Sequence, residues 1–224
     1  MLPAGSSLPD WLIWLETLSP KEIDIGLERV QVVLNRLSLP LPEHVLLIAG
    51  TNGKGSSVAM ADALLRAADY RVGAYTSPHV IDYNERIRVQ GRYADDAEIV
   101  AAFERIEAVR EDVPLTYFEY GTLAAMVLFA EASLDVWILE VGLGGRLDAT
   151  NVIEQPAVTV ITPVSIDHEQ FLGDTLGKIA AEKAGIIKPG VPCIVGPQED
   201  EALEVIEYTA ARLGAPLLVH GQHW

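Results

Sequence analysis

The segment from residue 45 to 57 carries the clearest chemical signal in the chain, and it reads VLLIAGTNGKGSS. An apolar strand, a glycine-rich loop and a helix start follow one another there. Backbone N–H groups of such a loop converge on an anion, and the helix N-terminus adds a partial positive charge. A lysine in the loop can reach the outer phosphates, so the segment predicts a nucleoside triphosphate site. The candidate nucleotide-binding residues are Asn52, Gly53, Lys54, Gly55 and Ser56.

This loop differs from the standard phosphate-binding pattern in its spacing. The first glycine of that pattern would fall on Ile48, and Gly55 separates Lys54 from the hydroxyl of Ser56. The alternative interpretation is an ordinary glycine-rich turn between a strand and a helix. The lysine, the two serines and the helical sequence that follows favour a variant phosphate loop.

Three further polar residues follow apolar runs that we expect to be strands. Ser77 could offer a hydroxyl to a metal or phosphate, or could belong to a Ser-Pro turn. Glu140 ends an apolar run, where a buried carboxylate needs a cation, so it is either a metal ligand or the partner of Arg146 in a salt bridge. His168 is either a metal ligand or a structural residue.

Two more candidates lie in a glycine-rich loop and near the end of a helix. Asp148 follows the loop at 142–145, where a planar ligand could approach the backbone, and its carboxylate could accept hydrogen bonds from an amino-bearing heterocycle. Its alternative role is to cap a turn or a helix. Lys183, taken by position alone, complements the dipole at a helix C-terminus.

Apolar runs and helical periodicity alternate along the chain. This pattern predicts an α/β fold with a largely parallel sheet flanked by helices on both faces, and ligands beyond the carboxyl ends of the strands. The expected strands are at 45–49, 72–76, 136–140, 158–162, 192–195 and 217–219, with a small edge strand or hairpin at 87–91. The expected helices are at 10–17, 25–37, 54–68, 96–109, 118–132, 175–184 and 200–213.

The formal charge of −16, from 16 Lys and Arg against 32 Asp and Glu, argues against a surface that binds nucleic acids or anionic membranes, because basic patches supply the affinity for both. An acidic chain that binds a polyphosphate must offset the repulsion locally, which predicts divalent cations beside the loop. The single Cys193 cannot form an internal disulfide. With no secretory signal or membrane span in the sequence, we expect a cytoplasmic protein. We also expect a monomer.

Six motifs in order resemble the bifunctional dihydrofolate synthase/folylpolyglutamate synthase family, relatives of the Mur ligases. They are GTNGKGS, TSPH, TYFEYGT, LEVGLGGRLDATN, DH and EKAGI, and they extend from residue 50 to 186. The resemblance implies a P-loop NTPase-like fold of the Mur ligase central-domain type. It also implies ATP-dependent amide formation, in which a carboxylate attacks the γ-phosphate and the amine of L-glutamate displaces phosphate from the resulting acyl phosphate.

The resemblance assigns roles to particular residues. It implies that Lys54 contacts the ATP phosphates and that Ser77, Glu140 and His168 ligate magnesium. It matches Lys183 to a family lysine that is carbamylated, a change that suits a second magnesium site. Lys54, Lys183 and His168 are thus the catalytic candidates. The pterin ring of dihydropteroate or of folates would contact a set of residues from three segments: Asp24, Ile25, Gly26, Leu27, Thr116, Tyr117, Phe118, Leu147, Asp148 and Ala149.

Members of this family are about twice as long as these 224 residues. We therefore expect residues 1–224 to form the N-terminal ATP-binding domain, without the C-terminal glutamate-ligase domain, and to be inactive alone. Two other functions stay open. One is a different phosphate-loop enzyme, such as a kinase or a Mur-type peptide ligase, which would have no pterin affinity. The other is a non-catalytic nucleotide-binding module.

Overall fold

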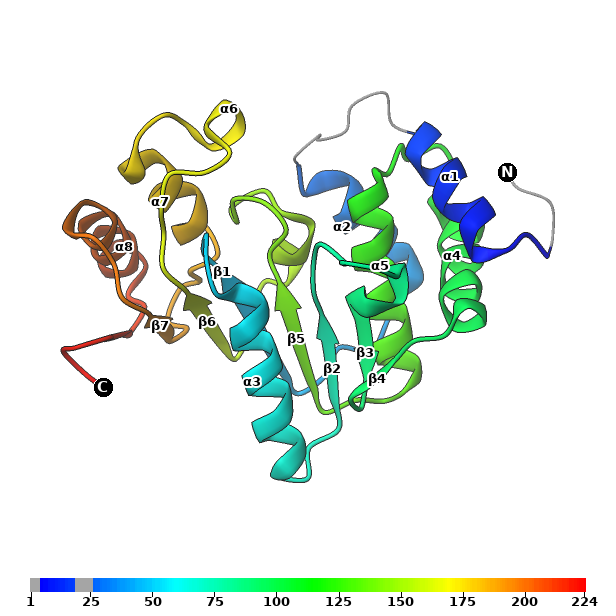
Figure 1. The fold of residues 1–224 in the computed structure, drawn as a ribbon, viewed down its shortest axis with the longest axis horizontal. Coiled ribbons are helices and arrows are strands. Elements are labelled where there is room, and N and C mark those ends of the chain that lie inside the picture. Colours follow the sequence, from blue (N-terminus) through cyan, green and yellow to red (C-terminus); the bar gives the residue numbers. More distant parts are fainter. Residues whose placement is uncertain (1–4, 19–25) are drawn as a thin grey trace.

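The computed structural model describes residues 5–18 and 26–224, which build one eight-stranded sheet (Figure 1). The strand order is β4-β3-β2-β5-β1-β6-β7-β8. All neighbours from β2 to β8 are parallel, whereas β3 pairs antiparallel with β2 and with β4. The strands are β1 (His44–Ala49), β2 (Val72–Tyr75), β3 (Ile87–Val89), β4 (Arg92–Tyr93), β5 (Val136–Glu140), β6 (Val158–Ile161), β7 (Cys193–Val195) and β8 (Leu217–Val219).

Helices cover both faces of the central strands, which explains why these strands are continuously apolar. Alternate residues of a strand point to opposite faces. On β1, Ile48 packs beneath α3 (Lys54–Ala67), while Leu47 belongs to the larger core on the other face. That larger core includes residues of α1 (Leu8–Leu18), α2 (Glu28–Leu37), α4 (Asp96–Arg110) and α5 (Tyr117–Glu131).

The remaining helices lie along the second half of the chain. They are the short α6 (Glu169–Leu172), α7 (Leu176–Ala184) and α8 (Asp200–Leu213), and α7 packs against α8 (Figure 1). Two 3₁₀ turns, η1 (Tyr83–Arg86) and η2 (Ala149–Val152), interrupt the loops after β2 and β5. Within the described residues no helix is long and apolar enough to cross a membrane.

The connections from the two central strands run in opposite directions. From β1 the chain passes through α3 to β2, beyond β5, whereas from β5 it passes through η2 to β6, on the other side of β1. Ligands of open α/β sheets bind at such a point, beyond the carboxyl ends of the diverging strands. The loops at 50–53 and 141–148 therefore meet where a ligand is expected.

The sequence prediction of the fold is confirmed, including the hairpin near residue 87, which forms β3 and β4. Helix and strand ends differ from the expected ones by a few residues at most. Helix α2 begins at Glu28. Ile25, the expected first residue, is not among the residues that the structure describes. The one-turn elements η1, η2 and α6 were not predicted, because four residues are too few to show a periodicity.

Candidate functional site

The phosphate loop joins β1 to α3 and needs glycine at its first position. The φ angle of Gly50 is +142°, and a Cβ atom there would lie 1.9 Å from Oγ1 of Thr162. Helix α3 has no side-chain N-cap, and its first bond joins the Ser57 N–H to the Gly53 carbonyl at 3.0 Å. In the described part of the chain, the N–H groups of Lys54, Gly55 and Ser56 have no acceptor. An unsatisfied helix start of this kind is an anion site.

Neighbouring bonds hold the loop in place. The backbone N–H groups of Thr51 and Asn52 both donate to the Pro163 carbonyl, at 2.9 and 3.2 Å. The Asn52 amide donates to Oγ of Ser165 at 3.1 Å, and Lys54 Nζ donates to the Thr51 carbonyl at 3.3 Å. The backbone of Asn52 therefore anchors the loop, while the N–H groups that are free for phosphate begin after it.

Glu140, at the end of β5, lies directly beside this helix start. A Cβ atom built on Gly55 would be 3.7 Å from the Glu140 carboxylate, which is buried and accepts the Ser77 N–H at 3.4 Å. Burial raises the pKa of Glu140, and the charge of Lys54 opposes that rise. The expected alternative, a salt bridge to Arg146, is wrong, because Arg146 pairs with Glu182 at 2.9 Å. Glu140 is thus a buried carboxylate without a salt-bridge partner in the described structure.

The three magnesium candidates come from the end of β5 and from the loops that follow β2 and β6. Ser77 and His168 line one cavity, and Ser77 is also bonded through its N–H to Glu140. His168 has a half-exposed side chain, with Nε2 at 3.7 Å from Asp167. Among the described residues, no three His, Cys, Asp or Glu side chains are grouped so as to hold a metal ion. The unpaired Glu140 and a serine hydroxyl nevertheless fit Mg²⁺, which takes few protein oxygens and completes its shell with water and phosphate.

A cavity of about 350 Å³ opens beside these residues and collects most of the predicted pterin contacts. Its lining is Gly26, Ser77, Pro78, Arg86, Thr116, Phe118, Glu119, Gly142, Leu143, Leu147, Asp148, Ala149 and His168. Two predicted residues, Leu27 and Tyr117, are not among them. Asp24 and Ile25 lie outside the described residues. The volume is in the range of small-molecule sites.

Phe118 and Asp148 shape the wall of this cavity. The Phe118 ring lies against Gly142, where an added Cβ would be 2.5 Å away, so this glycine admits the ring. Asp148 accepts the N–H groups of Gly142 and Leu143 on Oδ2, at 3.0 and 2.9 Å, and the N–H and hydroxyl of Thr150 on Oδ1, at 3.0 and 2.6 Å. A carboxylate has about four acceptor positions. Asp148 thus caps η2, which is the alternative role that the sequence suggested for it. An amino group of a ligand would have to share one of these acceptor positions.

Lys183, on α7, contacts the phosphate loop through its side chain. Its side chain is buried, and Nζ donates to the Gly50 carbonyl at 3.0 Å. Burial, and then the positive charge of Lys54, lowers the pKa of Lys183 to about 8. The amine therefore belongs to the phosphate site, and it loses its proton more readily than an ordinary lysine does.

Two charged residues of the cavity were missed from the sequence. Glu119 accepts the Thr116 N–H at 2.7 Å and pairs with Arg29 at 3.0 Å; the T-x-x-E spacing of a capping box, at 116–119, would have located it. Arg86, on η1, is buried and donates from Nε to Nδ1 of His79 at 2.8 Å. No pattern in the sequence distinguishes Arg86 from the chain's other arginines.

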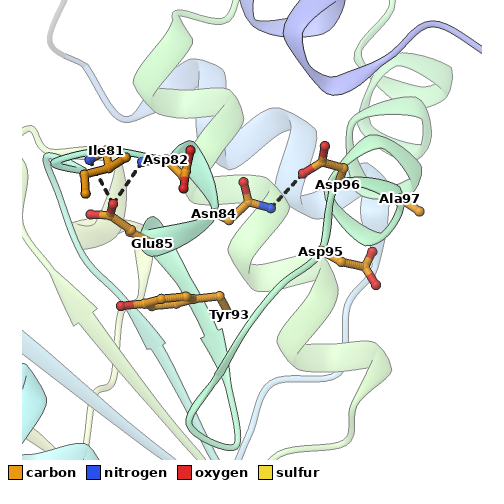
Figure 2. A pocket seen from close by; sticks show the side chains of 8 residues that line it. All are labelled: Ile81, Asp82, Asn84, Glu85, Tyr93, Asp95, Asp96 and Ala97. Atoms are coloured by element: carbon orange, nitrogen blue, oxygen red, sulfur yellow. Dashed lines mark hydrogen bonds between the residues drawn. The ribbon is translucent and has the colours of Figure 1, made fainter.

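A second, larger hollow of about 830 Å³ lies beside η1 and β4 (Figure 2). It is acidic, but its side chains are engaged with their own loops: Asn84 donates to Asp96 at 2.9 Å, and Glu85 accepts the N–H groups of Ile81 and Asp82. None of the predicted site residues lines it. The smaller cavity, next to the phosphate loop, is therefore the candidate active site.

Known proteins resemble this chain in sequence and in fold. The chain is 48% identical over 222 residues to dihydrofolate synthase/folylpolyglutamate synthase of Escherichia coli (strain K12), covering 99% of this chain and 52% of that protein. A solved structure, E. coli FolC in complex with DHPP and ADP, superposes with a TM-score of 0.94 at 48% identity, covering 99% of this chain and 53% of the other. The Yersinia pestis bifunctional synthase complexed with AMPPNP and Mn ion superposes with a TM-score of 0.90 at 46% identity, covering 98% and 53%.

The chain thus spans about half the length of the curated bacterial synthases that it matches. The model of the Mur ligase middle domain matches residues 48–221, which include the phosphate loop, Glu140 and Lys183. This chain therefore belongs to the family of proteins that contain a Mur ligase middle domain.

Proposed function

We propose that this chain is the part of a folate ligase that binds ATP and the pterin acceptor, and that the ligase joins L-glutamate to dihydropteroate and to folyl-glutamate. The observation that carries the proposal is the meeting of three features at one sheet edge. They are the uncapped start of α3, the unpaired carboxylate of Glu140, and an aromatic-walled cavity beside Ser77. The relatives named above, and solved structures with ADP, with AMPPNP and Mn, and with folate, support it.

The reaction requires one phosphoryl transfer and one acyl transfer. A carboxylate oxygen of the acceptor attacks the γ-phosphorus, an O–P bond forms, and the bond to ADP breaks. The amine of glutamate then attacks the carbonyl carbon of the acyl phosphate, and the amide forms as phosphate and a proton leave. Phosphoryl transfer depends on positioned charge more than on covalent help. Lys54 and the N–H groups at the start of α3 supply that charge.

Ser77, Glu140 and His168 are the residues that would hold magnesium, and the ion would offset the negative charge that develops on the transferred phosphate. Lys183 would be carbamylated: its neutral amine attacks CO₂, an N–C bond forms, and a proton leaves. The depressed pKa of Lys183 favours the required neutral form. The product is a carboxylate-like group opposite the Gly50 carbonyl, and it suits a second magnesium ion.

The acceptor's pterin ring would lie in the 350 Å³ cavity, with Phe118 offering an aromatic face. We further propose that these 224 residues form no product alone. Labelled glutamate, dihydropteroate and Mg-ATP test that statement directly, and product from the purified chain would contradict it.

Binding tests the wider proposal. Titrating the purified chain with Mg-ATP and separately with dihydropteroate should give saturable binding of both. A chain that binds Mg-ATP but no pterin would indicate another Mur-type ligase or a bare nucleotide module. A chain that binds neither ligand would contradict the proposed site as a whole.

A further inference from the structure

Arg86 is the one cavity-lining cation whose charge has no described counterion. Only 8% of the residue is exposed, and it lines the cavity together with Ser77 and Phe118. Within residues 5–18 and 26–224, Arg86 forms no ion pair. A guanidinium taken out of water without an anion is costly, so a buried one normally has a carboxylate or phosphate partner.

The carboxylate next to Arg86 in the chain and the two carboxylates that line the cavity already have other donors. Glu85 accepts three backbone N–H groups, two of which are drawn in Figure 2. Glu119 is paired with Arg29, and Asp148 holds its four bonds within its own loop. None of these groups neutralises Arg86 in the described structure.

Neutral groups hold the side chain of Arg86 in a fixed orientation. Its Nε–H donates to Nδ1 of His79 at 2.8 Å, and the guanidinium carbon lies 5.4 Å from the Tyr83 ring and 5.7 Å from the Tyr117 ring. Cation–π contacts stabilise a cation modestly and do not cancel its charge. Burial raises the pKa of Tyr75 to about 12 although Arg86 opposes the rise, so this phenol stays neutral too. The arrangement is an oriented, uncompensated guanidinium at the wall of a cavity.

We propose that Arg86 binds the carboxylate of the pterin-linked acceptor and thereby selects acceptors that carry one. The inference rests on the proposed function, because the acceptor occupies the same cavity. A planar guanidinium fork matches a carboxylate in two parallel hydrogen bonds, which a lysine cannot reproduce. With the ring beside Phe118, Arg86 would hold the acid end of the acceptor at the Ser77 side of the cavity, near the phosphate loop.

A matched pair of ligands tests this role in the full 224-residue chain. One is dihydropteroate, and the other is the same molecule with a methyl group in place of its carboxylate. We expect Arg86→Gln to weaken binding of dihydropteroate roughly 30-fold or more, as the loss of a buried charge contact does, and to leave the methyl analogue unchanged. Arg105→Gln is the control, because Arg105 forms an exposed ion pair with Glu131 and should affect neither ligand.

Arg86→Lys guards against a variant that does not fold. It keeps the charge and most of the stem, so it should weaken dihydropteroate binding several-fold and spare the methyl analogue. Equal weakening of both ligands would overturn the proposal and make Arg86 a packing residue, and so would unchanged dihydropteroate binding. Failure of the unmodified chain to bind either ligand would overturn the proposed acceptor site itself, and this inference with it.

Discussion

Replacing Lys183 with methionine tests the charge penalty that its buried position implies. Burial, followed by the charge of Lys54, lowers the pKa of Lys183 from 10.5 to about 8 in the folded protein. The unfolded chain keeps the ordinary value, so it binds more protons than the folded state between pH 8 and pH 10.5. The free energy of unfolding should therefore rise with pH across that window.

The magnitude follows from the two pKa values of Lys183. At pH 7 the amine is mostly charged in both the folded and the unfolded state. The difference between its two pKa values then costs the folded state roughly 3 kcal/mol of stability. At pH 9.5 the folded amine is neutral, and the remaining cost is about 1 kcal/mol. Lys183→Met removes this charge penalty at both pH values. The lost hydrogen bond to the Gly50 carbonyl lowers the stability of the variant by about 1 kcal/mol at either pH. The stability of the variant relative to wild type should thus fall by about 2 kcal/mol between pH 7 and pH 9.5.

Urea unfolding of both proteins at the two pH values, in buffer free of CO₂, measures this difference. Lys178→Met is the matched control, because Lys178 lies on the same helix in an exposed pair with Asp174. Its stability relative to wild type should not change with pH over this range. A Lys183→Met difference that is equally independent of pH would refute the reasoning, since it would mean that the buried amine carries no charge penalty.

Four further substitutions have specific expected outcomes. Gly50→Ala should destabilise the fold by about 3 kcal/mol or more, because the added Cβ would meet Oγ1 of Thr162. Gly53→Ala adds a Cβ that meets no atom within 4 Å, so it should cost only about 1 kcal/mol. Thermal melts compare the two variants, and equal losses of stability would contradict this. Glu140→Gln should weaken nucleotide binding about tenfold with Mg²⁺ and not in EDTA, since it removes only the metal-binding charge; equal weakening in both buffers would exclude Glu140 as a ligand. Phe118→Ala should lower pterin affinity about tenfold by calorimetry and leave nucleotide affinity unchanged; unaltered pterin affinity would place the ring elsewhere.

The sequence predicted the positions of the chemistry-bearing residues because parallel strands end at one edge. Ser77 and Glu140 follow different strands, yet the fold brings the Ser77 N–H to the Glu140 carboxylate, and Gly55 lies beside the same group. This clustering could be predicted without the strand order, because the carboxyl ends of all parallel strands lie at the same edge of the sheet.

Hydrogen-bond partners were beyond the reach of the sequence. The pattern left Glu140 with either a metal or Arg146, and only the packing of α7 shows that Arg146 is engaged by Glu182. Asp148 suggested a ligand contact, whereas the folded loop directs four donors toward it. Arg86 stood out only once its burial and its lack of a counterion were known. The Arg146–Glu182 pair joins segments far apart in the chain, whereas the bonds to Asp148 depend on the backbone path of its own loop.

In the proposed function, one site at the sheet edge holds both Mg-ATP and a pterin acceptor. The most direct test is calorimetric titration of the purified chain with dihydropteroate, with and without magnesium and a non-hydrolysable ATP analogue. We predict saturable dihydropteroate binding whose affinity changes when the nucleotide is present, because the cavity shares Ser77 with the proposed magnesium site. Nucleotide binding with no detectable dihydropteroate binding in either condition would contradict the claim.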